Sequence, residues 1–406
     1  MESNKLYEEL LDLPLISITG VKIESNKIKI SCESKLSSAY CPCCLKAQTK
    51  INQERKRVIR DLSISDKNVE LELTSRQFIC EECDRIFYEK FNFVSSYERM
   101  TIRYENFIYK RCIGVDLSYV SVQENLEWHR VNRIFKKWST KSIEKADLLS
   151  NIRALGIDEI ALKKGHKDFV CVLVNLETGE VVDILEDRTK SNLISYFKAL
   201  GSDFCERIIV FSSDMCEGYI NTAKELFPNA DIVVDRFHFF AHLQKALDSC
   251  RKALRRQFPN AEELKKVKWL FLKNRVNLST EQEKQLSELL ANSDYVLLKE
   301  TYEAKESFRA ILEENITRNQ ADEKLTNWTI RILEKDNKYL NKFIKTFGNW
   351  YDYILNYFNG RWSNGMVEGI NNRIKIACPE SSGIKRRAFG FEDFSSFRNR
   401  ILVEFI

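Results

Sequence analysis

The sequence predicts an α/β protein, in which a mixed β-sheet core carries a helical insertion and follows two smaller N-terminal modules. Three observations predict this class. Five short apolar segments alternate with amphipathic segments between residues 153 and about 256. The chain then keeps helical spacing to about residue 350, whereas residues 1–97 hold short β-like runs between paired cysteines. With 406 residues, of which 44% are hydrophobic, the chain is long enough for two or three domains.

Composition and charge exclude several classes of protein. No window reaches the roughly 18 uninterrupted apolar residues of a membrane span, and the N-terminus lacks a secretory signal pattern. We therefore expect a cytoplasmic protein without a membrane partner, whose twelve cysteines are not a disulfide framework. Residues 99–141 hold nine Lys/Arg against four Asp/Glu, and residues 251–275 hold nine against two. Such local basic surfaces indicate a polyanionic partner.

Residues 1–97 are expected to form a zinc-binding module. Two C-x-x-C pairs are separated by predicted strands, and together they supply the four thiolates of a closed, structural zinc site. The alternative is that these cysteines are small buried hydrophobes, which matched spacing disfavours. Cys32 and Cys43 are spare thiols that complicate the assignment. The predicted Zn²⁺ ligands are Cys41, Cys44, Cys80 and Cys83.

Residues 98–150 predict a helix-turn-helix domain. Gly114 is placed to end its first helix and Ser118 to cap the second. A short helix, a tight turn and a basic helix can place side chains in a DNA major groove, although a small bundle with a solvated basic face is the alternative. The expected face of the first helix is Tyr104, Phe107, Ile108, Arg111 and Cys112. The third helix is expected to bury Val131, Ile134, Phe135 and Trp138. Its outer, DNA-contacting residues would be Arg130, Asn132, Arg133, Lys136 and Lys137.

The remaining residues, 151–406, are expected to form one domain around a sheet. The strands are predicted at 153–162, 168–176, 180–186, 207–214 and 230–235, with helices after the third, fourth and fifth. A helical insertion is expected over about 241–350, where Leu325, Trp328 and Ile332 keep helical spacing.

Carboxylates follow the predicted strands of this domain. Asp158 lies inside the first strand, where an unpaired charge is unfavourable, and Asp214 ends the fourth. Two carboxylates on adjacent strands repel each other unless a cation lies between them, and oxygen ligands suit Mg²⁺ or Mn²⁺. A third carboxylate from a helix would complete a two-metal site for phosphoryl transfer, and Glu368 in "SNGMVEGINNRIK" is the candidate.

Helix capping is the alternative explanation for some of these acids. Asp214 with Glu217 fits a capping box, and Asp235 could cap a helix beginning at Arg236. Capping does not explain Asp158. The helix of Glu368 is predicted to begin at Ser363 or Asn364 and to pack through Val367, Ile370, Ile374 and Ala377.

The order of these acids resembles the DDE transposases of bacterial insertion sequences, and most of all the family usually labelled ISL-three. The resemblance is carried by Asp158, Asp214, the Asp-x-x-His from Asp235 to His238, and Glu368. The cysteine pairs, the helix-turn-helix and the closing "GFEDFSSFRNRIL" are similar to that family too, so the resemblance covers nearly the whole chain.

The resemblance implies an RNase H-like catalytic core that cleaves and joins DNA with Mg²⁺ or Mn²⁺. Asp158, Asp214 and Glu368 match the catalytic DDE triad, and Asp235 with His238 matches the (Cys/Asp)-x-x-His element of related transposases. Asp214 is preferred to Asp235 as second metal ligand, because the fourth strand lies beside the first in RNase H-like topology.

The implied partner is double-stranded DNA, as terminal inverted repeats and target, bound by a homodimer or higher oligomer on the nucleoid. Arg255, Arg256, Lys385 and Arg386 would contact phosphates and Trp362 could stack on a base, although solvated faces and core packing are the plainer alternatives. Two other functions stay open: a DNA-binding regulator with a degenerate RNase H-like domain, and a nuclease that does not join strands.

Overall fold

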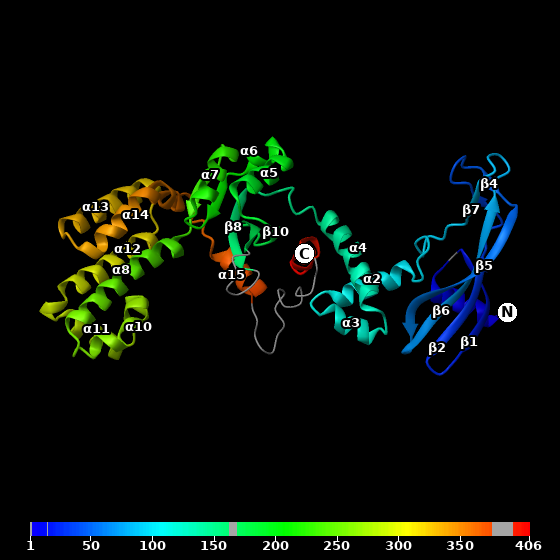
Figure 1. Cartoon of the computed structure of the whole chain (residues 1–406), viewed down its shortest axis with the longest axis horizontal. Coiled ribbons are helices and arrows are strands. Elements are labelled where there is room, and N and C mark those ends of the chain that lie inside the picture. The colour runs from blue at the N-terminus through cyan, green and yellow to red at the C-terminus, as the bar shows by residue number, and fades with distance from the viewer. Residues whose placement is uncertain (1, 14, 162–168, 376–392) are drawn as a thin grey trace. The chain divides into compact units, whose positions relative to one another are not determined.

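The computed structural model describes residues 2–13, 15–161, 169–375 and 393–406 (Figure 1). The chain divides into two compact units, Met1–Lys145 and Ala146–Ile406. None of the helices in the described ranges is long and apolar enough to cross a membrane.

A five-stranded sheet forms the first part of the N-terminal unit. This part of the chain begins with the helix α1 (Glu2–Leu11). The sheet consists of β1 (Ile16–Ile23), β2 (Lys27–Ser34), β5 (Ile51–Ile64), β6 (Lys67–Ile79) and β7 (Ile86–Tyr88). A separate two-stranded ladder is formed by β3 (Ala39–Tyr40) and β4 (Ala47–Gln48). The strand order is β1-β2-β6-β5, with β7 on β6, and only the β2–β6 pairing within this sheet is parallel. Ile28, Ile30 and Cys32 alternate with more exposed residues and face one core, as a period of two requires.

Three helices complete this unit: α2 (Ile102–Cys112), α3 (Leu117–Gln123) and α4 (Trp128–Ala146). Thr101 begins α2, because its hydroxyl accepts a hydrogen bond from the Tyr104 backbone N–H. Buried Asp61 of β5 accepts hydrogen bonds from the side chains of Thr101 and Arg103, which ties α2 to the sheet. The sheet and the helices therefore form one unit.

Gly114, with a φ of 81°, follows the end of α2 as expected, but two other expectations for these helices are wrong. The expected face of α2 is present: Tyr104, Ile108 and Cys112 are buried, and Phe107 is exposed at the edge of this face, where its ring stacks on Tyr104. Ser118 lies inside α3, because that helix already begins after Asp116. Trp138 is only half-buried, and Ser139 takes its place in the buried stripe of α4.

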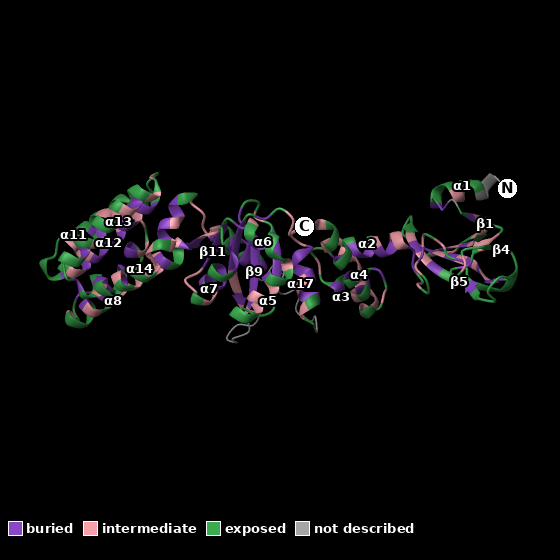
Figure 2. Cartoon of the chain, turned by 90° about the horizontal axis from the view of Figure 1, so that it is seen from above, coloured by how far each residue is buried: buried purple, intermediate pink, exposed green. Residues whose placement is uncertain are grey.

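The second unit is built on a mixed five-stranded sheet. Its strands and covering helices are β8 (Ala154–Ala161), β9 (Phe169–Asn175), β10 (Val181–Leu185), α5 (Lys190–Leu200), α6 (Ser202–Arg207), β11 (Val210–Ser213), α7 (Glu217–Leu226) and β12 (Asp231–Val234). The order is β10-β9-β8-β11-β12, in which β8, β9 and β10 pair antiparallel and β11 and β12 run parallel to β8. All five predicted strands are present. One face packs Ile157, Leu173 and Phe211 against α5, α6 and α7, and Figure 2 shows these strands as buried.

A helical segment follows β12 without a break. It consists of α8 (Arg236–Gln257), α9 (Glu263–Lys266), α10 (Lys268–Leu272), α11 (Thr280–Leu290), α12 (Val296–Glu313), α13 (Arg318–Glu334) and α14 (Lys338–Leu355). Leu325, Trp328 and Ile332 are buried, as their spacing predicts. Trp328 packs with Phe308 and Phe343 in an aromatic core that joins α12, α13 and α14.

Two C-terminal helices return to the sheet, α15 (Gly365–Lys375) against β8 and α17 (Phe394–Leu402) against β10. Close approach of α15 depends on Gly156 in β8. A Cβ at that position would lie 2.7 Å from Leu176 Cδ2 and 2.8 Å from Val367 Cγ2. The absence of a side chain at Gly156 therefore sets how near α15 lies to the sheet.

Candidate functional site

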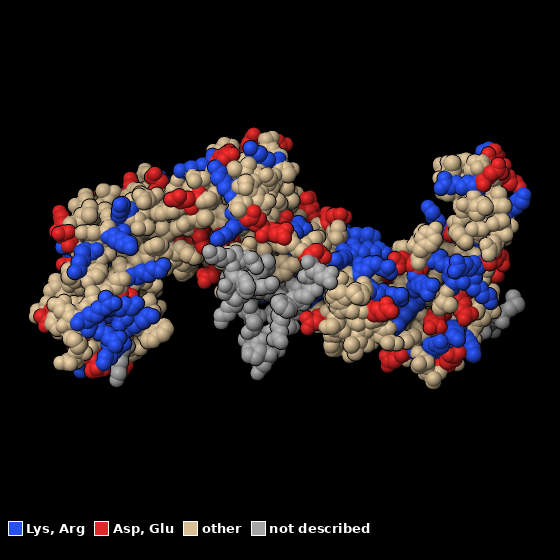
Figure 3. Space-filling view, viewed as in Figure 1, with Lys and Arg blue, Asp and Glu red and all other residues tan. Residues whose placement is uncertain are grey.

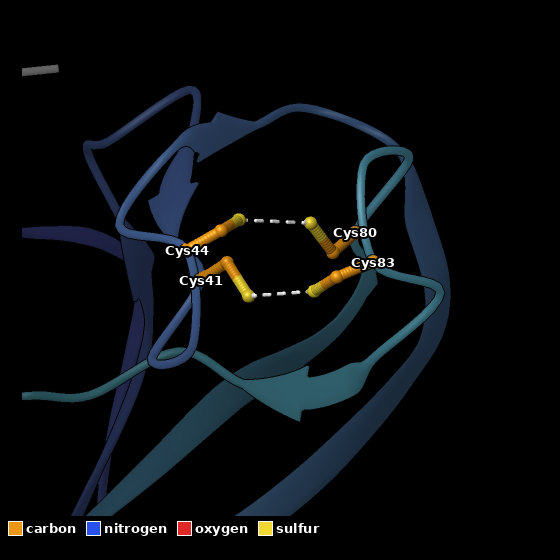
Figure 4. Close-up of side chains that lie close together, drawn as sticks. All are labelled: Cys41, Cys44, Cys80 and Cys83. Atoms are coloured by element: carbon orange, nitrogen blue, oxygen red, sulfur yellow. Dashed lines mark hydrogen bonds between the residues drawn. The ribbon is translucent and has the colours of Figure 1, made fainter.

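The four paired cysteines meet at the end of the first sheet (Figure 4). Cys41 and Cys44 lie in the turn between β3 and β4, and Cys80 and Cys83 lie between β6 and β7. The Sγ atoms of Cys41 and Cys83 are 3.6 Å apart, and those of Cys44 and Cys80 are 3.4 Å apart. These distances are too long for a disulfide, at about 2.05 Å. They are close to the ~3.8 Å expected between thiolates that lie ~2.3 Å from one tetrahedral zinc.

The thiols of this cluster differ in how easily they ionise. Backbone N–H groups of Cys44 and Cys43 lower the pKa of the Cys41 thiol to about 6, whereas hydrogen bonding with the Cys80 sulfur raises the pKa of Cys44 and raises that of Cys83 to about 12. The two spare cysteines lie outside the cluster. Cys43 is exposed, and burial in the sheet core raises the pKa of Cys32 to about 12. The donor set therefore fits a closed structural zinc site, made by the four residues that the spacing predicts.

Three aspartates lie in or directly after neighbouring strands of the second sheet: Asp158 in β8, Asp214 after β11 and Asp235 after β12. β8, β11 and β12 run parallel, and their register is fixed by pairs such as Gly156 with Ser212. Continuing that register to the strand ends brings Asp158, Asp214 and Asp235 to the same level. Since side chains alternate along a strand, Gly156 and Asp158 share the face against which α15 packs.

Asp214, Asp235 and His238 form a compact cluster. His238 Nδ1 lies 2.8 Å from Asp214 Oδ1 and 3.3 Å from Asp235 Oδ2. Asp214 and then Asp235 raise the pKa of His238 to about 10, so the ring carries a positive charge at neutral pH. Asp235 Oδ1 is buried and accepts no hydrogen bond from any residue in the described ranges. An unsatisfied buried carboxylate oxygen is a chemically suitable cation ligand.

Helix capping does not explain these two aspartates. The residue that begins α7 is Cys216, not Asp214, so Asp214 makes no capping box with Glu217. Asp235 does stand at the start of α8, but its side chain accepts no hydrogen bond from the helix backbone. Both carboxylates are directed toward His238 instead.

Asp158 is held from α15. Asn371, which is fully buried, donates a hydrogen bond from Nδ2 to Asp158 Oδ2, while Asp158 Oδ1 accepts from the Glu159 backbone N–H at 2.7 Å. Asn364, also buried, donates to the Ile157 carbonyl at 2.9 Å, so its amide fixes α15 to β8 rather than capping the helix with its side chain. Glu368 lies one turn before Asn371 and is exposed.

The structure joins some predicted site residues and not others. It brings Asp214, Asp235 and His238 together, but among the described residues this cluster includes neither Asp158 nor Glu368. Glu368 makes no hydrogen bond or ion pair with the cluster in the part of the chain that is described. Asn371 is not among the residues that the motif predicts. The helical pattern nevertheless carries a signal for it, because Asn371 is four residues after Val367 and so falls on the buried stripe.

Two of the basic residues of α4 form ion pairs within the first unit. Lys137 contacts buried Glu105 at 2.6 Å, rather than lying free on the outer face, and Arg133 pairs with Glu98 at 3.0 Å. The other three differ in exposure: Lys136 is exposed, and Arg130 and Asn132 are half-buried.

In the second unit, Arg255 and Arg256 are exposed near the end of α8 and Trp362 is half-buried. Lys385, Arg386 and Ala377 lie outside the described residues.

Comparison with known proteins covers both units. A family model for transposases, of the DDE type and ISL3 group, matches residues 155–401. A second model, for the zinc finger of the transposases of IS204, IS1001, IS1096 and IS1165, matches residues 37–83 and thus includes all four clustered cysteines. The chain is 27% identical over 372 residues to the transposase for insertion sequence element IS1001 of Bordetella parapertussis, covering 90% of this chain and 88% of that protein. It is 26% identical over 292 residues to the transposase for IS1557 of Mycobacterium tuberculosis, covering 66% and 63%.

Proposed function

The chain belongs to the ISL3 family of DDE transposases, and from this we propose that it binds the terminal inverted repeats of its insertion sequence and catalyses metal-dependent DNA cleavage and strand transfer. One observation carries the proposal. Asp158 lies in β8, and Asp214 and Asp235 directly follow β11 and β12, the two strands that run parallel to β8, so the continued register puts the three acids at one level. The helix that bears Glu368, α15, packs against β8.

The proposed catalytic core is RNase H-like. Its support is the sheet order β10-β9-β8-β11-β12, with antiparallel pairing of the first three strands in sequence and parallel addition of the last two. This order puts the fourth strand beside the first, and so Asp214 beside Asp158. The helices α8 to α14 would then be an insertion between the fifth strand and the helix of Glu368.

The proposed metal ligands are Asp158, Asp214 and Glu368, with Asp235 in support. Divalent cations bound there would stabilise the entering and leaving oxygens of an in-line displacement at phosphorus. Asn371 orients Asp158 through the hydrogen bond to Oδ2. His238, with Nδ1 2.8 Å from Asp214 Oδ1 and 3.3 Å from Asp235 Oδ2, would orient these two carboxylates. These side chains would bind the cations or orient the residues that bind them, and none of them needs to form a covalent bond to DNA.

The N-terminal unit is the proposed DNA-end binding module. We assign its cysteine cluster to a structural zinc and α2 to α4 to a helix-turn-helix whose basic third helix contacts DNA. Lys136 and Arg130 are the better candidates for contact, since Lys137 is committed to Glu105. Because an element has two ends to be cleaved, we expect at least a dimer on DNA.

The test is an assay of cleavage and strand transfer on the DNA ends that flank the gene, with Mg²⁺ or Mn²⁺. Wild type should cut and join these ends, and Glu368→Ala should lose both activities by at least about a hundredfold. Glu225→Ala, which removes an exposed helical glutamate elsewhere in the same unit, is the matched control and should be fully active. Activity of Glu368→Ala equal to that of wild type would overturn the assignment of the third carboxylate.

A DNA-binding regulator is the second candidate, because Glu368 is exposed and does not contact the aspartates within the described ranges. A regulator would bind the repeats equally well without divalent cation and leave them intact. A nuclease that does not join strands would give nicked ends without integrated products. The same assay separates all three functions.

A further inference from the structure

The helical insertion carries a basic face on α8 and α10. Figure 3 shows a dense patch of Lys and Arg over this part of the molecule. Asp248, the acid on this stretch of α8, already pairs with Arg251 and Lys252. The cations of this face that form no ion pair within the described ranges are Lys245, Arg255, Arg256 and Lys268.

Trp269 stands within this basic face and is 71% exposed. The chain has six tryptophans, all in described ranges, and the other five are half-buried or buried. The Lys268 ammonium lies 6.0 Å from the centre of the Trp269 ring. A large aromatic side chain left in water beside cations is the kind of exposed group that marks a binding surface.

Two buried cations fix the backbone that presents Trp269. Arg251 donates from Nη1 to the Leu264 carbonyl at 2.8 Å. Lys305, which is fully buried, donates from Nζ to the carbonyls of Phe271 and Lys273 at 2.8 and 2.9 Å. The segment is therefore anchored from its inner side, and the Trp269 ring is not needed to hold it in place.

We propose that this face, α8 with α10, binds DNA at an element end, with Lys245, Arg255, Arg256 and Lys268 on phosphates and Trp269 stacked on an unpaired base. Phosphate is the polyanion that an uncompensated row of cations recognises. Base stacking on an aromatic side chain tolerates any sequence, so it suits a strand opened during cleavage. The proposal rests on the transposase function and adds to it a site for single-stranded DNA.

The experiment measures binding of full-length protein to fluorescent DNA without divalent cation, so that no strand is cut. The probes are a blunt duplex of one element end and the same duplex with a short single-stranded overhang. Trp269→Ala should weaken binding to the overhang probe about tenfold and leave the blunt duplex within about twofold. Leu333→Ala removes a 51% exposed side chain from α13 of the same insertion and should change neither affinity.

A triple variant, Arg255→Ala with Arg256→Ala and Lys268→Ala, tests the phosphate contacts. The slope of log affinity against log salt concentration is negative, and each lost phosphate contact makes it shallower by about 0.9, so loss of three contacts should reduce its magnitude by about 2.7. The control for net charge is Lys299→Ala with Lys324→Ala and Lys335→Ala, which removes three lysines elsewhere in the insertion and should keep the wild-type slope. An unchanged slope in the first triple variant, or equal weakening of both probes by Trp269→Ala, overturns the proposal.

These outcomes are separable from those of the cleavage assay. A protein that cuts and joins DNA normally but shows no effect of either variant refutes the DNA-binding face alone. A protein that shows the expected binding changes but never cuts DNA keeps this face and loses the catalytic proposal.

Discussion

At the scale of single residues, Asn371 is predicted to position Asp158. Asn371→Ala removes the hydrogen bond to Asp158 Oδ2 and should lower strand cleavage about 10- to 100-fold, as loss of a partner that orients a metal ligand commonly does. A role in orienting that ligand also predicts a higher Mg²⁺ concentration for half-maximal activity. A purely structural role would leave that concentration unchanged.

The neighbouring residue gives the control for this prediction. Asn372 is exposed, and Asn372→Ala should match wild type in both activity and Mg²⁺ dependence. Wild-type cleavage by Asn371→Ala at low Mg²⁺ would contradict the positioning role.

The candidate site could be predicted from sequence only in part at this scale. Asp214 and Asp235, which directly follow apolar strands, can be recognised as candidates because a charged side chain near a buried strand is unfavourable unless it is paired or binds a metal. The contact of Asp235 with His238 follows from i,i+3 spacing at the start of α8, whereas the contact of Asp214 with His238 depends on the path of the chain between β11 and α8, which no spacing rule gives. Asn371 falls on the buried stripe of the helical pattern, but its partner Asp158 lies 213 residues earlier, so the sequence does not show which group it binds.

At the scale of elements, the contact between α15 and β8 is predicted to depend on Gly156. Gly156→Ala puts a methyl group against Leu176 and Val367, and overpacking of this kind costs about 1–3 kcal/mol. The midpoint of denaturant unfolding of the variant should fall accordingly, and cleavage should fall with it because α15 is displaced.

Gly369→Ala is the control for this prediction, and it is expected to raise stability rather than lower it. Gly369 lies in α15, and an added Cβ would have no atom of the described residues within 4 Å beyond its own stretch of helix, so Gly369→Ala should stabilise the protein by about 0.5–1 kcal/mol. Equal unfolding midpoints for the two variants would contradict the close-approach role of Gly156.

The strands were the most predictable elements. Apolar runs such as Val170 to Val174 are too short and too β-branched to be helices, and the structure has a strand at each of the five predicted places. Helix ends were less predictable, as α3 shows, since Asp116 and Ser118 are both acceptable first residues.

At the scale of the whole molecule, removal of zinc is predicted to affect the two units differently. Chelation, or Cys80→Ser, should release about one zinc per chain and abolish binding to the repeats, while the second unit remains folded. Zinc content by atomic absorption and limited proteolysis of each unit check this. Release should also increase as the pH falls, because the thiolate ligands take up protons.

Cys43→Ser is the matched control for the zinc prediction. Cys43 is exposed and lies outside the four-cysteine cluster, so its replacement should leave zinc content and DNA binding unchanged. Full zinc content in Cys80→Ser would show that the cluster is not the metal site.

The sequence could not predict how the distant parts of the second unit meet. The pattern at Glu368 predicts a helix, but its packing on β8 depends on a chain that first passes through α8 to α14. Long-range contacts of this kind leave no periodic trace in the sequence.

The late position of α15 has a consequence for a chain that is still being synthesised. Domains emerge and fold from the N-terminus, so the first unit and the strands that bear Asp158, Asp214 and Asp235 precede the helix that fixes Asp158. If the proposed function holds, a nascent chain would complete its DNA-binding unit before its catalytic site. A copy interrupted before Gly365 would retain the first unit and the three aspartates but lack α15, and is expected to compete with the intact protein for the repeats.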